Sequence, residues 1–68
     1  MHFMELLIRL KERREELTLT QEALSELSGV SLRTIKQCES GIGNPTIKTV
    51  MNLAEILGLE LNLKVQEA

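Results

Sequence analysis

The chain has 68 residues, of which 43% are hydrophobic and 26% charged, and its formal net charge is −2. This length corresponds to one small domain, and this apolar content is too high for a disordered tail, so two domains and intrinsic disorder are both excluded. The single cysteine excludes an internal disulfide, and no apolar run approaches the roughly 18 residues of a membrane span, so we expect a reduced, cytoplasmic setting.

Positive and negative charges are separated along the chain. Basic side chains concentrate in residues 9–14 and 30–50, whereas residues 15–26 carry four glutamates. Because charges act within a Debye length of about 8 to 10 Å, an acidic total does not exclude a nucleic-acid partner. Taken alone, the pattern favours solvated helix faces.

The first predicted helix covers about residues 3–16. Its apolar stripe has three- and four-residue spacing and consists of Phe3, Leu7, Leu10 and Leu17, with Arg14 as an interruption. Further apolar residues on the same segment exceed what one stripe requires; they are Met4, Leu6 and Ile8. These residues either complete the core or cover a second subunit.

The next two predicted helices are short and share a tight turn. Thr20 can cap the first of them, with Leu24 and Leu27 on its inner face, and Gly29 suits the left-handed residue after its end. Ser31 can cap the following helix, which runs to about residue 40 and is closed by Gly41 in the same way.

A fourth helix is predicted after Thr46, with an apolar stripe of Ile47, Val50, Met51, Ala54 and Leu57, and it ends at Gly58. From residue 59 to about residue 65 the hydrophobic period changes to two, which is typical of a half-buried strand. One strand cannot satisfy its own backbone hydrogen bonds, so its partner must come from outside the chain, and the simplest partner is a second copy. An antiparallel pair centred on Asn62 matches both charge and apolarity: Glu60 faces Lys64, Leu61 faces Leu63, and Leu59 faces Val65.

The two short helices carry a recognisable run of residues. The segment from Thr20 to Ser31 reads TQEALSELSGVS and is followed by Thr34, Ile35, Glu39 and Gly41. Over residues 6–58 the chain resembles the Cro/C1-type (XRE-family) helix-turn-helix regulators, and its tail, ILGLELNL over residues 56–63, resembles the HipB-like antitoxin branch. The chain departs from the common pattern at Thr18, where a glycine is usual, and at Ala23, where a glutamate is frequent.

The resemblance implies a mainly α fold: a single four-helix, lambda-repressor-like domain over residues 1–68. The helix-turn-helix would occupy about residues 20–40, and one C-terminal strand at about residues 59–65 would pair between subunits. Arg14 would form a structural ion pair with Glu39, tying the first helix to the end of the third. The resemblance places Cys38 in the core as a small buried hydrophobe.

The third helix would be the recognition helix in the DNA major groove. With Ile35 and Cys38 inward, the outward positions are Leu32, Arg33, Lys36 and Gln37. Leu32, Arg33 and Gln37 match base-contacting positions of the family, so Arg33 would bind a guanine edge and Gln37 an adenine edge. Expected phosphate contacts are Thr20, Gln21, Ser31, Ser40, Asn44 and Thr46, with Arg13 and Lys48 as peripheral candidates. Three of these residues, Thr20, Ser31 and Thr46, serve equally well as helix caps.

The implied function is a sequence-specific transcriptional repressor that binds a pseudo-palindromic double-stranded operator as a homodimer and associates with the nucleoid. The tail would make it the antitoxin and autorepressor of a HipBA-like module, with a HipA-like kinase toxin as protein partner. Two alternatives stay open: a standalone or phage-type repressor, or an interaction module that has lost DNA binding. His2 stands alone in a chain without aspartate, so we expect no enzymatic activity, no metal and no cofactor.

Overall fold

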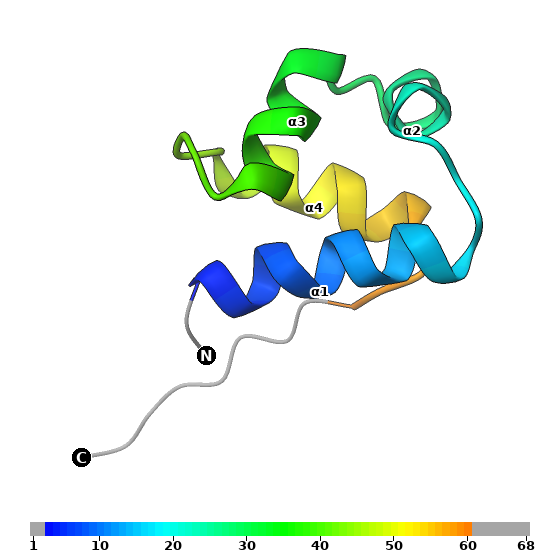
Figure 1. The fold of residues 1–68 in the computed structure, drawn as a ribbon, viewed down its shortest axis with the longest axis horizontal. Helices are drawn as coiled ribbons and strands as arrows, with labels where there is room; N and C mark the ends of the chain where they lie inside the picture. Colours follow the sequence, from blue (N-terminus) through cyan, green and yellow to red (C-terminus); the bar gives the residue numbers. More distant parts are fainter. Residues whose placement is uncertain (1–2, 61–68) are drawn as a thin grey trace.

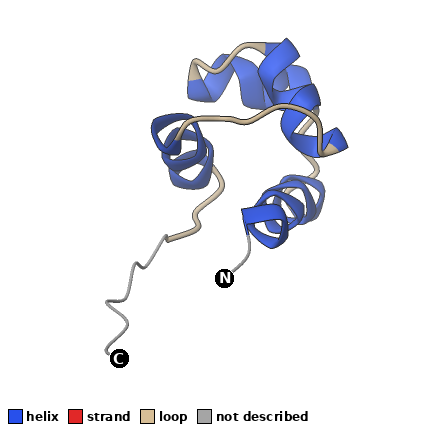
Figure 2. Ribbon diagram, turned by 90° about the vertical axis from the view of Figure 1, so that its left-hand side faces the viewer, coloured by secondary structure: helices blue, strands red, loops and turns tan. Residues whose placement is uncertain are grey.

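Four helices make up the described part of the chain, residues 3–60 of a computed structural model (Figure 1). They are α1 (Phe3–Glu16), α2 (Gln21–Ser28), α3 (Leu32–Ser40) and α4 (Ile47–Ile56). Helix α2 packs against α3 and α4, and α1 lies against α3. All four predicted helices are confirmed, and no strand occurs among residues 3–60 (Figure 2).

The three predicted N-caps are present. The hydroxyl oxygens of Thr20, Ser31 and Thr46 accept hydrogen bonds from the backbone N–H groups of Ala23, Thr34 and Thr49, at 3.0, 3.2 and 3.1 Å respectively. Each cap therefore satisfies one of the backbone donors that the first helical turn leaves free. The starts of α2, α3 and α4 are thus fixed by single residues that the sequence identifies.

The turns between these helices use left-handed backbone. Gly29 follows α2 with a φ of 75°, and Gly41 follows α3 with a φ of 77°. Thr18, which stands where the family usually has glycine, also has a positive φ, of 55°. A β-branched residue in this region costs about 1 to 3 kcal/mol, so the turn between α1 and α2 keeps its left-handed shape at the expense of stability.

One hydrophobic core joins the four helices. Its buried members are Leu7, Leu10, Leu24, Val30, Ile35, Cys38, Val50, Leu53, Ala54 and Leu57. The predicted stripe of α1 is buried at its centre only, since Phe3 and Leu17 at its two ends are each 38% exposed. Met4 and Ile8 are exposed as well, whereas Leu6 packs against the core.

The prediction that Leu27 shares the inner face of α2 with Leu24 is wrong, because its side chain is 58% exposed. Two serine side chains occupy the inner side instead. The Ser25 hydroxyl donates to the carbonyl of Val30 at 2.6 Å, and the Ser28 hydroxyl accepts from the N–H of Val30 at 3.2 Å. These hydrogen bonds tie α2 to the turn that follows it, and Leu27 faces outward.

The predicted stripe of α4 is wrong in two positions. Ile47 and Met51 are 59% and 54% exposed, whereas Leu53, which the prediction left out, is buried together with Val50, Ala54 and Leu57. The buried residues follow the spacing i, i+3, i+4, i+7 from Val50. Met51 is displaced from that row by one residue, which is about 100° around the helix.

The end of α4 leads into the segment predicted to be a strand. The N–H of Leu59 donates to the carbonyl of Ala54 at 2.9 Å, and the Leu59 side chain packs partly buried against the core of its own domain. Glu60 is exposed. The other members of the predicted strand, Leu61 to Val65, lie outside the described residues. Within residues 3–60, no helix has the length and apolarity needed to cross a bilayer.

Candidate nucleic-acid interface

The outer face of α3 collects the residues predicted to read bases. Arg33 and Lys36 are exposed, and Leu32 and Gln37 are partly exposed. These four side chains and Ser40 line a single surface hollow. Ile35 and Cys38, on the opposite side of α3, are 1% and 5% exposed and anchor the helix in the core. The structure therefore brings the predicted reading residues together on a helix whose other face is fixed.

An ion pair ties the end of α3 to α1. The Arg14 guanidinium donates to both carboxylate oxygens of Glu39, from Nε to Oε2 at 2.7 Å and from Nη2 to Oε1 at 2.9 Å. Both side chains are largely buried, at 12% and 9% exposure. The hydrogen bond to Glu39 raises the pKa of Arg14 above its ordinary value, against the opposing effect of burial. This bidentate contact is the geometry in which a guanidinium binds a carboxylate most strongly.

Two further contacts extend this ion pair to α2. Nη1 of Arg14 donates to the backbone carbonyl of Leu19 at 2.6 Å, just before the start of α2. The side-chain amide of Gln21, in the first turn of α2, donates to Oε1 of Glu39 at 3.0 Å. Gln21 was predicted to contact phosphate, and its amide nitrogen is here already engaged by Glu39. The network holds α1, α2 and α3 in a fixed relative position.

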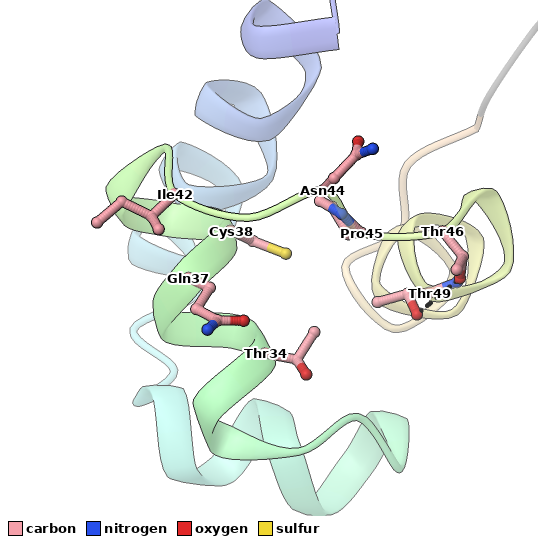
Figure 3. Close-up of a pocket in the computed structure, with 8 residues that line it drawn as sticks. All are labelled: Thr34, Gln37, Cys38, Ile42, Asn44, Pro45, Thr46 and Thr49. Atoms are coloured by element: carbon pink, nitrogen blue, oxygen red, sulfur yellow. Dashed lines mark hydrogen bonds between the residues drawn. The ribbon is translucent and has the colours of Figure 1, made fainter.

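A second hollow lies between α3 and the start of α4 (Figure 3). It is lined by Thr34, Gln37 and Cys38 of α3, by Ile42, Asn44 and Pro45 of the loop, and by Thr46 and Thr49 of α4. Asn44 and Thr46, both predicted phosphate contacts, are exposed here. The Gln37 side chain lies beside Gly43 of the loop, where an added Cβ would be 3.5 Å from its Oε1.

The hydroxyl groups of the two later N-caps are already engaged. The Ser31 hydroxyl lies 2.8 Å from that of Thr34, and the Thr46 hydroxyl lies 3.0 Å from that of Thr49. Thr34 and Thr49 were not predicted as site residues, although the sequence repeats the same spacing of hydroxyl residues at the start of both helices. Ser40, also predicted to contact phosphate, is exposed and donates to the carbonyl of Gln37 at 3.1 Å. Thr20 is exposed and caps α2.

Ion pairing divides the basic residues between 3 and 60 into two sets. Arg9 and Arg13 pair with Glu16, at 3.1 and 3.9 Å, and Arg14 pairs with Glu39. The remaining four basic side chains of this part of the chain form no ion pair; they are Lys11, Arg33, Lys36 and Lys48. The acidic total of the sequence therefore conceals four cations that no ion pair within residues 3–60 engages, two of which lie on α3.

Arg13 is engaged in a contact that the sequence did not predict. Its Nε donates to the backbone carbonyl of Leu57 at 2.9 Å, at the end of α4. A cation is favourable at a helix C-terminus, where backbone carbonyls lack partners. Arg13 was predicted as a peripheral phosphate contact, and in the structure its side chain joins α1 to the end of α4.

Cys38 offers no reactive thiol. It is 5% exposed, and burial raises the pKa of its thiol above the ordinary value. Since the thiolate is the reactive form of cysteine, this environment suppresses reactivity at neutral pH. Cys38 is thus the small buried hydrophobe that the resemblance placed in the core.

Comparison with known proteins gives matches to helix-turn-helix proteins. Residues 10–64 match the helix-turn-helix family HTH_3. A protein of Methanothermobacter thermautotrophicus that is named an HTH-type transcriptional regulatory protein is 38% identical over 56 residues, which cover 82% of this chain and 18% of that protein. An uncharacterized HTH-type transcriptional regulator of the same organism is 44% identical over 51 residues, or 75% of this chain and 74% of that protein. The chain thus spans only a small part of the first relative and most of the second.

Proposed function

The chain belongs to the helix-turn-helix family, and we propose that it is a transcriptional repressor that recognises a specific DNA operator with the exposed face of α3. One observation carries this proposal. Among residues 3–60, the cations without an ion-pair partner include both basic residues of α3, Arg33 and Lys36, which lie beside Leu32 and Gln37 in one hollow. A helix that presents unpaired cations and amide groups on one face is suited to the major groove.

Each residue of this face has a distinct role in the proposal. Arg33 donates two hydrogen bonds to O6 and N7 of a guanine, and the Gln37 amide pairs with an adenine edge. Leu32 packs against a thymine methyl group, and Lys36 supplies positive charge beside the reading residues. Phosphate contacts come from the polar groups around α3 and at the starts of α2 and α4: Thr20, Gln21, Ser31, Ser40, Asn44 and Thr46.

The proposal includes a homodimer. Apolar side chains of the described domain stay exposed on α1 and α4, among them Met4, Ile8 and Met51, and such surface is suited to a second subunit. The alternating residues 59–65 would add an antiparallel strand pair about a twofold axis. Two recognition helices related by that axis would lie about 34 Å apart, one turn of DNA, and would read a pseudo-palindromic operator.

We further propose that the repressor is the antitoxin of a HipBA-like module, silences its own operon and binds a HipA-like kinase toxin. The support is the likeness of residues 56–63 to the HipB-like branch. A standalone or phage-type repressor would share residues 1–58 and lack the toxin. An interaction module that has lost DNA binding would be compatible with the acidic total charge, and the unpaired cations on α3 argue against it.

A selection of duplexes from a random pool, followed by affinity measurements at increasing salt, tests the DNA-binding part of the proposal. A dimer that touches 6 to 10 phosphates should lose about 10³- to 10⁵-fold in affinity between about 50 and 200 mM salt. The selected sequences should share two half-sites of opposite orientation. No duplex enriched at low salt would leave the interaction module as the remaining function.

Purification of the tagged chain from its native cells tests the antitoxin part. A kinase-like protein recovered in stoichiometric amount, together with DNA from the promoter of the chain itself, is the expected result. DNA recovered without a protein partner would make the chain a standalone repressor.

A further inference from the structure

A third surface hollow lies where α1, α2 and α3 meet. Lys11 and Arg14 of α1, Gln21 of α2, and Lys36, Glu39 and Ser40 of α3 line it. Lys36 and Ser40 also line the hollow that holds the predicted base-reading residues. The two hollows therefore adjoin each other at Lys36 and Ser40 on the exposed side of α3.

The charges in this third hollow do not cancel. Arg14 and Glu39 neutralise each other through two hydrogen bonds, and the Gln21 amide donates to the same carboxylate. Without this pairing, the Glu39 carboxylate would repel an anion. The two lysines, Lys11 and Lys36, form no ion pair among residues 3–60, so the lining carries one neutralised ion pair and two positive charges. Glu15 and Glu22, whose charges act on Arg14, lie outside the lining.

Lys11 differs from its basic neighbours on α1. Arg9 is paired with Glu16, and Arg13 is bonded to the carbonyl of Leu57. Lys11 is exposed and lies four residues before Glu15, yet no ion pair joins the two. A Lys four residues before a Glu is also the weaker of the two pairing orders on a helix. Among the described basic residues of α1, Lys11 is the one whose charge is available to a partner beside α3.

We propose that this hollow binds one phosphate group of the DNA backbone, held between the ammonium groups of Lys11 and Lys36. The inference rests on the proposed function, because the phosphate belongs to the DNA whose bases α3 reads. It assigns to α1 a direct DNA contact, and to the Arg14–Glu39 pair the role of a neutral support that keeps a carboxylate from opposing the phosphate. Contacts of this kind fix the register of the recognition helix without reading sequence.

The test compares two variants of α1 that lose the same charge. Lys11→Gln removes the proposed phosphate contact, whereas Arg9→Gln removes a cation that is paired with Glu16. Binding to a short random-sequence duplex is measured as a function of salt for the wild type and for both variants. We expect Lys11→Gln to reduce the slope of log affinity against log salt by about 0.9 for each subunit bound, because one phosphate contact is lost. Arg9→Gln should leave that slope unchanged, and Lys11→Arg should retain it.

The outcomes separate the two proposals. If the wild type shows no salt-dependent binding to any duplex, the proposed function fails. If the wild type binds and the slope for Lys11→Gln equals the slope for Arg9→Gln, the phosphate site at Lys11 is wrong while DNA binding stands. Equal thermal midpoints of the two variants establish that any difference in slope arises at the interface and not from unfolding.

Discussion

Helices α3 and α4 begin in the same way and are held in the domain by different means. Helix α3 follows the N-cap Ser31 and contains 9 residues, and α4 follows the N-cap Thr46 and contains 10 residues. Helix α4 buries a full row of apolar side chains: Val50, Leu53, Ala54 and, at its end, Leu57. Helix α3 buries Ile35 and Cys38 alone, and the bidentate ion pair from Arg14 holds its last turn through Glu39.

This difference explains how so small a domain keeps the outer face of α3 open. Apolar burial stabilises a helix only by covering its surface, and the inner row of α4, Val50, Leu53 and Ala54, is covered in this way. A polar contact at one end fixes the orientation of α3 while its outer face stays open. The helix that stabilises the domain and the helix that we propose to read DNA are therefore neighbours with separate tasks.

The largest effect is expected when the ion pair at the end of α3 is broken. Glu39→Gln leaves the Arg14 guanidinium, which is 12% exposed, without a carboxylate, and should reduce the free energy of unfolding by about 3 to 5 kcal/mol. Glu16→Gln is the control, because the Glu16 side chain is 50% exposed and its ion pairs should contribute no more than about 1 kcal/mol. Equal losses in urea denaturation of the two variants would show that the ion pair does not hold α3.

Truncation of the core at the end of α4 should have the next largest effect. Leu57 is fully buried, so Leu57→Ala should reduce the free energy of unfolding by about 2 to 5 kcal/mol through lost burial and a cavity. Met51→Ala removes an exposed side chain of the same helix and should change stability by about 0.5 kcal/mol or less. A larger loss from Met51→Ala would mean that this residue is covered in solution, as a second subunit on α4 would do.

Removal of the principal reading residue should affect binding and leave folding intact. Arg33→Ala should weaken binding to the selected operator by about 1 to 3 kcal/mol and relax the preference at one base pair. Because Arg33 is exposed and forms no ion pair within the described residues, the free energy of unfolding should change by about 0.5 kcal/mol or less. Unchanged operator affinity would remove Arg33 from the contacts that read bases.

The smallest effect is expected when the N-caps of α3 and α4, Ser31 and Thr46, are removed. Ser31→Ala and Thr46→Ala should each reduce the free energy of unfolding by about 1 kcal/mol, because each leaves one backbone donor of a first turn without its partner. Amide hydrogen exchange should increase in the first turn of α3 for Ser31→Ala more than in the first turn of α4 for Thr46→Ala, since less apolar burial holds α3. Equal increases would mean that the two helices are held equally firmly.

Local signals in the sequence predicted the helices well. Caps such as Ser31 and glycines such as Gly41 act through their own backbone neighbours, so their positions fix where a helix begins and ends. Which side of each helix faces the core was predicted less well. Leu27 and Met51 are apolar and correctly spaced, yet they are exposed, because partners distant in the sequence set the rotation of a short helix.

The candidate site likewise has features that local sequence signals predict and features that depend on residues distant in the sequence. The outward face of α3 follows by helical periodicity once Ile35 and Cys38 are placed inward, and the family resemblance implied the inward position of Cys38. The pairing of Arg14 with Glu39 was implied by family resemblance, since no local rule joins residues 25 positions apart. The contact of Arg13 with Leu57 spans 44 positions, and neither spacing nor resemblance indicated it.

Chemical-shift mapping is the most direct test that the exposed face of α3 binds DNA. Backbone amide signals of the labelled protein would be recorded with and without a selected duplex. We expect the largest shifts in α3 and in the first turns of α2 and α4, with small shifts at the exposed apolar residues of α1, Met4 and Ile8. Large shifts at those apolar residues, with α3 unaffected, would contradict the assignment of α3 as the DNA-reading helix.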